Sequence, residues 1–198
     1  AAWRNRPLGE VPYLILDARY EKIRHGGAVV SCAVLVAIGV TTEGARSILG
    51  VSVSLSEAEV HWREFLAALQ GRGLHGVRYV VSDDHAGLEE ARQARLAGVP
   101  WQRCQFHLAQ NALHYVPSVA LRSEVARDLR GVLDAGDRPE ADRRLEQLVQ
   151  KYAAAAPKLA TWLETNVPES LTVLSLPAAH RRRLRTTNML ERINKEIK

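Results

Sequence analysis

The sequence predicts an α/β protein with a mixed five-stranded sheet covered by helices and an all-helical domain inserted late in the chain. Two patterns support this class. Three β-rich segments joined by short turns open the chain, and further strands then alternate with helices up to about residue 115. From there to about residue 170 the apolar residues repeat at helical spacing. We therefore expect a core over 1–115, a helical insertion over 116–170 and a return to the core over 171–198.

The first three strands are expected over 13–23, 28–40 and 45–55. The turns "RHGG" and "TTEG" separate them, and such short connections join antiparallel neighbours. The nearly apolar stretch 28–40 is predicted to be one of these strands. It is too short for a membrane-spanning helix, which needs about 20 apolar residues.

The apolar period changes after the third strand. A helix is expected over 56–73, begun by a capping box of Ser56 and Glu59. Its apolar stripe is formed by Val60, Phe65, Leu66 and Leu69. The segments that follow are a strand over 77–82, a helix over 87–98, a strand over 101–106 and, beyond the helical insertion, a strand over 171–176. The expected sheet order is 3-2-1-4-5, which makes the first and fourth strands neighbours.

The net charge of +5 is concentrated at the end of the chain. Residues 180–198 hold seven Lys/Arg and two Glu, a net of 7 − 2 = +5, whereas the other 179 residues hold 20 basic and 20 acidic side chains. A basic run of this kind suits a polyanion, although a solvated helix face explains the charge equally well. Cys32 and Cys104 form no CxxC pair and the N-terminus shows no signal-peptide pattern, so we expect a cytoplasmic protein.

Three aspartates follow or interrupt apolar strands. "YVVSDDHAGL" at 79–88 ends a buried-looking strand in Asp83 and Asp84, and Asp17 interrupts the apolar first strand. If those strands are neighbours, two carboxylates meet, and a divalent cation would relieve their repulsion. Turn formation or helix capping is the commoner role of an aspartate at a strand end.

A third acid lies in "TTNMLERINKEIK", within a basic terminal helix. Glu191 lies off the helix stripe and shares its side with Asn194 and Lys198. It can serve a metal site, or it can be the N3 acid of a capping turn begun by Asn188. The apolar stripe consists of Met189, Leu190, Ile193 and Ile197.

The remaining motifs are weaker. "CQFH" places Cys104 and His107 as half of a zinc site, with no second pair at suitable spacing. A buried structural thiol is the commoner interpretation of Cys104, with a cysteine nucleophile as the alternative. The sequence contains no phosphate-binding GxxxxGK[ST] loop, no GxGxxG and no GxSxG motif.

Taken together, these motifs resemble the catalytic domain of the Mutator-type transposases of bacterial insertion sequences. The resemblance implies a ribonuclease H-like fold and an Asp-Asp-Glu triad of Asp17, Asp83 and Glu191 that binds two Mg²⁺ (or Mn²⁺) ions. It makes Asp84 a bystander and associates Cys104 and His107 with the active-site region. The matching blocks are "LILDARYEKIR", "AVLVAIGVTTEGARSILG", the stretch from "VSLSEAEVHW" to "YVVSDDHAGL", "WQRCQFHLAQNAL" and "RTTNMLERINKEIK".

The resemblance also implies metal-dependent DNA strand cleavage and strand transfer for transposition of an insertion element. The implied partners are the element's terminal inverted repeats and target DNA, with a homodimer at full length and a nucleoid-associated location. Sixteen residues precede Asp17 and seven follow Glu191, which suggests a fragment or truncated element. The alternatives are an inactive truncated remnant that only binds DNA and another ribonuclease H-like nuclease. The predicted DNA contacts are Arg181, Arg182, Arg183, Arg185, Asn194 and Lys198.

Overall fold

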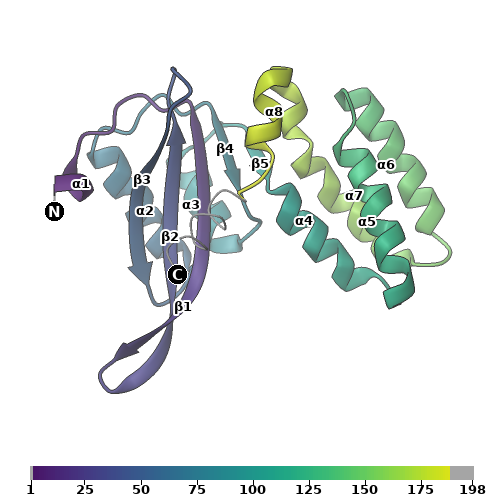
Figure 1. Cartoon of the computed structure of the whole chain (residues 1–198), viewed down its shortest axis with the longest axis horizontal. Helices are drawn as coiled ribbons and strands as arrows, with labels where there is room; N and C mark the ends of the chain where they lie inside the picture. The colour runs from purple at the N-terminus through teal and green to yellow at the C-terminus, as the bar shows by residue number, and fades with distance from the viewer. Residues whose placement is uncertain (1, 188–198) are drawn as a thin grey trace. The chain divides into compact units, whose positions relative to one another are not determined.

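The sheet has five strands in the order β3-β2-β1-β4-β5, which confirms the predicted order (Figure 1). β1 pairs antiparallel with β2 and parallel with β4, and β2 pairs antiparallel with β3, so the sheet is mixed, as predicted. The strands are β1 (Tyr13–His25), β2 (Ala28–Val40), β3 (Arg46–Ser54), β4 (Tyr79–Ser82) and β5 (Trp101–Arg103).

The computed structural model describes residues 2–187, and for His25 it describes the backbone only. The predicted positions Glu191, Asn194 and Lys198 therefore lie outside the described residues. The chain forms two compact units, 1–100 and 101–198, whereas the sequence analysis placed boundaries after residues 115 and 170. The difference arises because the residues just after β5 and the segment 171–174 pack into the helical core of the second unit.

The first unit holds the helices α1 (Ala2–Asn5), α2 (Glu59–Gly71) and α3 (Ala86–Arg95). α2 lies against the sheet, because Phe65 and Leu69 come within about 3 Å of the position that a Cβ on Gly50 would occupy. Two predictions for this helix are wrong. Val60 is 52% exposed and Trp62 is buried in its place, since the helix begins three residues later than expected.

The predicted capping box of α2 is the second correction. No side chain caps the helix. The Ser56 hydroxyl accepts a hydrogen bond from Ala58 N–H at 3.4 Å, two residues along, and Glu59 forms an ion pair with Arg63 instead. The helix ends at Gly71, and Gly73 with φ of +90° turns the chain out of it.

Over residues 101–187 the second unit is helical apart from β5, and the helices predicted for 116–170 are confirmed. Its α-helices are α4 (Gln105–Ala112), α5 (Val119–Leu133), α6 (Arg138–Tyr152), α7 (Pro157–Asn166) and α8 (Ala178–Leu184). Three short 3₁₀ helices are η1 (Leu113–Tyr115), η2 (Val167–Ser170) and η3 (Thr172–Ser175). The predicted strand over 171–176 is wrong: Leu171, Val173 and Leu174 are buried in the helical core, and 3₁₀ turns present all three to it.

Buried amides join the start of the helical unit to its later part. Gln102 donates to Ser170 O at 2.6 Å and accepts from Val173 N–H at 2.6 Å, and Gln105 donates to Ser170 O at 2.9 Å. Arg103, which is 2% exposed, bonds to Asn166 at 2.7 Å. Over residues 2–187, no helix is long and apolar enough to cross a membrane.

Candidate active site

The two predicted aspartates lie on neighbouring strands. Ile15 of β1 is paired with Val81 of β4 in a parallel register. Asp17 lies two residues beyond Ile15, and Asp83 lies two residues beyond Val81, directly after β4 ends at Ser82. Side chains alternate between the faces of a strand, and parallel neighbours are about 4.8 Å apart. Continued two residues past Ile15 and Val81, this register would bring Asp17 and Asp83 to the same face and the same level of the sheet.

Asp17 is held inside the sheet. Its side chain is 8% exposed, and its cross-strand partner on β2 is Val36, which is equally buried. A carboxylate in such surroundings is costly unless it binds a positive or hydrogen-bonding group. The regular strand on which it lies also fixes its direction, which suits a ligand more than a solvated turn residue.

The chain after β4 forms a tight polar turn. Ser82 hydroxyl donates to Asp83 O at 2.9 Å, and one carboxylate oxygen of Asp83 accepts the N–H of Asp84 at 2.8 Å. Asp83 is half-buried and Asp84 is exposed. Asp83 is therefore the less exposed of the two carboxylates.

Close backbone packing fixes this turn. A Cβ on Gly87, in the first turn of α3, would lie 2.3 Å from Glu57 O and 2.7 Å from Glu59 N, so only glycine fits. His85 lies 4.0 Å from the Glu57 carboxylate. The start of α3 is thereby packed against the start of α2, which sets the position of Asp83 two residues before His85. The sequence analysis placed Gly87 at the start of a helix and did not predict this contact.

The Cys104–His107 pair serves a structural purpose at the start of α4. Cys104 is fully buried, and its sulfur accepts hydrogen bonds from the N–H of Thr187 at 3.3 Å and from the Thr187 hydroxyl at 3.5 Å. Gln105 N–H donates to Arg185 O at 3.0 Å. These bonds hold residues 185–187 against α4, directly before the segment that carries Glu191.

The same bonds influence the thiol. Burial disfavours the thiolate, but hydrogen bonds from His107 and Thr187 outweigh it and lower the pKa of Cys104. A thiol with no exposed surface cannot reach a substrate, so the geometry favours the buried structural interpretation over a nucleophile. Thr187 was missed in the sequence, where nothing local distinguishes it from Thr186.

The four predicted DNA-contacting arginines fall into two pairs. Arg181 donates to Leu176 O and Gly136 O, both at 2.7 Å, and Arg185 forms an ion pair with Asp134 at 2.6 Å. Arg182 and Arg183 are exposed on α8. Arg181 and Arg185 therefore stabilise the helical unit, and Arg182 and Arg183 present charge to solvent.

The donor set fits a hard divalent cation. Two carboxylates at one level of neighbouring strands supply the oxygen ligands that Mg²⁺ prefers. Among residues 2–187, no group of three His, Cys, Asp or Glu side chains could hold a metal ion, and the third predicted ligand, Glu191, lies outside this range.

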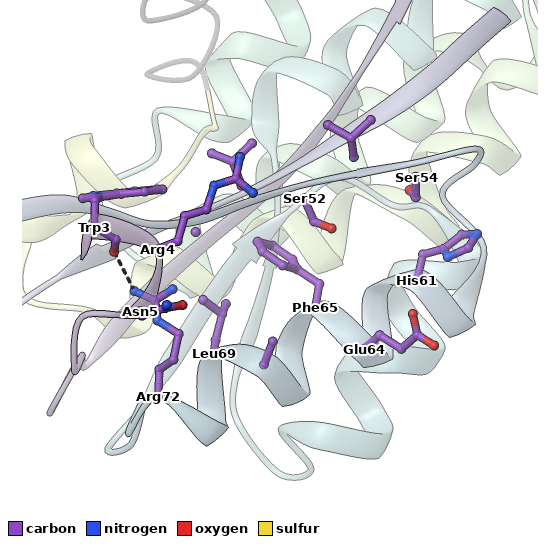
Figure 2. A pocket seen from close by; sticks show the side chains of 14 residues that line it. Trp3, Arg4, Asn5, Ser52, Ser54, His61, Glu64, Phe65, Leu69 and Arg72 are labelled. Carbon is purple, nitrogen blue, oxygen red and sulfur yellow. Dashed lines mark hydrogen bonds between the residues drawn. The ribbon is translucent and has the colours of Figure 1, made fainter. Parts of the chain in front are cut away.

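A hollow in the first unit lies away from these carboxylates. It encloses about 550 Å³ between α1, β3 and α2, and the residues seen to line it include Trp3, Phe65 and Arg72 (Figure 2). Arg72 donates to Leu49 O at 2.7 Å and to Trp3 O at 3.5 Å, tying the N-terminal segment to the sheet edge. Burial and the nearby charge of Arg6 lower the pKa of Arg72. No predicted site residue lines this hollow.

Comparison with known proteins places the chain in a family. The family model described as "Transposase, Mutator family" matches residues 1–198. The transposase for insertion sequence element IS406 of Burkholderia multivorans is 56% identical over 197 residues, covering 100% of this chain and 51% of that protein. The transposase for ISRM5 of Rhizobium meliloti is 43% identical, covering 100% and 50%. The chain belongs to the Mutator family of transposases, and it spans about half the length of these relatives.

Solved structures give a much weaker likeness. The HTLV-2 integrase catalytic core domain in complex with magnesium is 14% identical with a TM-score of 0.29, covering 91% of this chain and 99% of that chain. At that TM-score the family assignment rests on the sequence relatives alone.

Proposed function

We propose that this chain is the catalytic core of a transposase that cuts DNA strands and transfers them during movement of an insertion element. The observation that carries the proposal is the matched register of Asp17 and Asp83 on neighbouring parallel strands. Ligands of open α/β sheets gather at the carboxyl ends of the strands, and Asp83 lies directly after the carboxyl end of β4, next to the strand that carries Asp17. Membership of the Mutator family supports the same activity.

The residues of this chain have distinct roles in the proposed reaction. Asp17, from inside a strand, and Asp83, from a turn fixed by Gly87, would hold Mg²⁺ or Mn²⁺ together with Glu191. When bound, a pair of such ions activates the attacking oxygen and stabilises the leaving oxygen in phosphoryl transfer. Arg182 and Arg183 would bind backbone phosphates, which fixes DNA position without reading sequence. The homodimer and the nucleoid association stay predictions.

A nicking assay tests the proposal. The purified chain is mixed with supercoiled DNA that carries the element ends, with and without Mg²⁺, and nicked product is followed over time. We expect Mg²⁺-dependent nicking that falls at least about a hundredfold in Asp17→Asn and in Asp83→Asn, because several kcal/mol of charge stabilisation is lost. Asp84→Asn is the matched control and should cut like the parent chain.

Two other outcomes point to the alternatives. DNA binding without any Mg²⁺-dependent cleavage would identify a remnant that only binds DNA. Cleavage of the RNA strand of an RNA–DNA hybrid, with no joining of DNA ends to a second DNA molecule, would identify another ribonuclease H-like nuclease. Either result contradicts the proposed strand transfer.

A further inference from the structure

The first two strands extend past the rest of the sheet. β3 pairs with β2 only from Ala33 to Val40, and β4 pairs with β1 only from Tyr13 to Ile15. Glu21 pairs with Cys32, so residues 21–32 form a two-stranded ribbon, which we call the β1–β2 ribbon, and Figure 1 shows it projecting beyond the end of β3. A projecting ribbon buries little apolar surface, so packing within the fold does not explain its length.

The tip of the ribbon is narrow. His25 pairs with Ala28, so the turn consists of Gly26 and Gly27 alone. Both have positive φ, +57° and +83°, which is the two-residue turn that matches the twist of antiparallel strands. No side chain widens the tip at these two positions. Two strands about 4.8 Å apart fit into the major groove of B-DNA, which is about 12 Å wide and admits a β-ribbon.

One face of the ribbon is basic. Tyr20, Lys22 and Arg24 alternate along β1 on this face, and all three side chains are exposed, Tyr20 to 51%. Ser31 and Val29 lie opposite Lys22 and Arg24 on β2. Within the described residues, neither Lys22 nor Arg24 forms an ion pair. The opposite face carries the Arg19–Glu21 ion pair, which neutralises its own charge.

The local charge contrasts with that of its unit. Residues 1–100 hold eleven basic and eleven acidic side chains, a net charge of zero. Residues 21–32 hold two basic and one acidic side chain, 2 − 1 = +1, so the remainder of the unit is at 0 − 1 = −1. Lys22 and Arg24 lie together on one face of the ribbon and Glu21 lies on the other, so the basic face suits a polyanion.

We infer that the β1–β2 ribbon is a DNA-binding arm that enters a groove of DNA, with Lys22 and Arg24 on backbone phosphates. The inference rests on the proposed function. Side chains alternate along β1, so Lys22 and Arg24 lie on the face opposite to Asp17, and Arg24 lies seven residues beyond Asp17, up to about 24 Å away at 3.4 Å per residue. The arm therefore contacts DNA outside the segment that reacts at the carboxylates.

The test compares two double variants of the whole chain. Lys22→Gln with Arg24→Gln removes the two ribbon charges, and Arg63→Gln with Arg95→Gln removes two exposed charges from α2 and α3 of the same unit. DNA affinity is measured between 50 and 200 mM salt. Each lost phosphate contact reduces the slope of log affinity against log salt by about 0.9, so the ribbon variant should lose about 1.8. The affinity ratio between parent and ribbon variant then shrinks about twelvefold over this range.

The control variant should keep the parent's slope. Equal slopes for the ribbon variant and the control would contradict the proposal that the ribbon binds DNA. A ribbon variant that binds DNA like the parent but loses self-association in sedimentation would also overturn it, and would assign the ribbon to a second copy of the chain.

Failure of the proposed function is separate from these results: it appears as a parent chain that binds no DNA, or that binds DNA normally but never nicks it.

Discussion

Asp17 and Asp83 are separated by 83 − 17 = 66 residues in the chain, yet each lies two residues beyond the paired residues Ile15 and Val81. Their equivalence depends on the parallel pairing of β1 with β4, which the crossover through β2, β3 and α2 makes possible. A one-residue slip of β4 would move Asp83 to the other face of the sheet and bring Asp84 to the level of Asp17.

That relationship predicts a shared ion. Calorimetry should detect Mn²⁺ binding to the parent chain that is lost in both Asp17→Asn and Asp83→Asn. Asp84→Asn should bind as the parent does. Loss of binding in Asp84→Asn with binding kept in Asp83→Asn would show that the register in solution differs by one residue.

Glu191 is predicted to be a metal ligand and not merely a helix cap. Glu191→Gln is nearly isosteric, so the melting temperature should stay within about 2 °C of the parent while Mg²⁺-dependent nicking falls at least about tenfold. The comparison is best made in a version extended past Lys198. A capping role predicts the reverse, a lower melting temperature with unchanged nicking.

Cys104 is predicted to hold the segment that leads to Glu191. Cys104→Ala leaves the buried N–H of Thr187 without its acceptor, which costs about 1–3 kcal/mol of folding free energy. The nicking rate should fall even at temperatures where the variant is fully folded. Cys32→Ala is the control, because Cys32 is also buried but lies on β2. Equal nicking by the two variants, measured well below both melting temperatures, would remove Cys104 from the positioning role.

Gly87 is predicted to tolerate no side chain. Gly87→Ala forces a Cβ into the backbone of residues 57–59 and should destabilise the chain by about 1–3 kcal/mol or more, seen as a lower denaturant midpoint. Gly71→Ala, at the end of α2 with no atom within 4 Å of the new Cβ, should not lower the midpoint. Because Gly87 sets the turn that carries Asp83, the variant should also bind Mn²⁺ more weakly.

The helical unit should lose stability in acid through Asp128. Burial alone would raise the pKa of Asp128, but hydrogen bonds from Lys151 at 2.6 Å and Tyr152 at 2.8 Å hold it below its usual value. Burial, with the bond to Asp128, raises the pKa of Tyr152 to about 12. A carboxyl group with a lower pKa in the folded state stabilises the fold above its unfolded pKa, and this contribution is lost as the pH falls through the folded value.

Asp128→Asn should therefore cost about 1 kcal/mol near pH 6, and the difference from the parent should shrink as the pH falls below about 4. Thermal melts between pH 3 and 6 measure it. Asp142→Asn, which removes only the exposed pair with Arg138, should cost a few tenths of a kcal/mol at most. A gap that stays constant down to pH 3 would contradict the role of Asp128.

The strands could be predicted where glycine marks the turns. β2 has the predicted bounds and β1 extends only two residues further, because Gly26 and Gly27 leave no freedom in where the strands reverse. The strand expected over 101–106 stops at Arg103, since Cys104 and the residues after it begin α4. Nothing in the local pattern separates a short buried strand from the first turn of a buried helix.

The site was predictable in part. Asp17 stood out as a charge inside an apolar strand, and its neighbour Asp83 followed from the strand order. The contacts that support them were not predictable, because Gly87 meets residues 57–59 and Thr187 meets Cys104 only after folding. Val60 and the segment 171–176 were misassigned for the same reason: tertiary packing, and not local periodicity, decides which apolar side chains are buried.

The buried amides of Gln102 and Gln105 have a consequence for how relatives can differ. By hydrogen bonding to Ser170 and Val173, these two side chains join the start of the helical unit to its later part, so the chain enters and leaves the helices at neighbouring positions. Everything between is a closed loop in the topological sense, and lengthening such a loop costs only about 0.6 kcal/mol per doubling. Relatives can therefore differ in the number and length of the helices between residues 106 and 169, provided that the hydrogen bonds of the two glutamines to the backbone are retained.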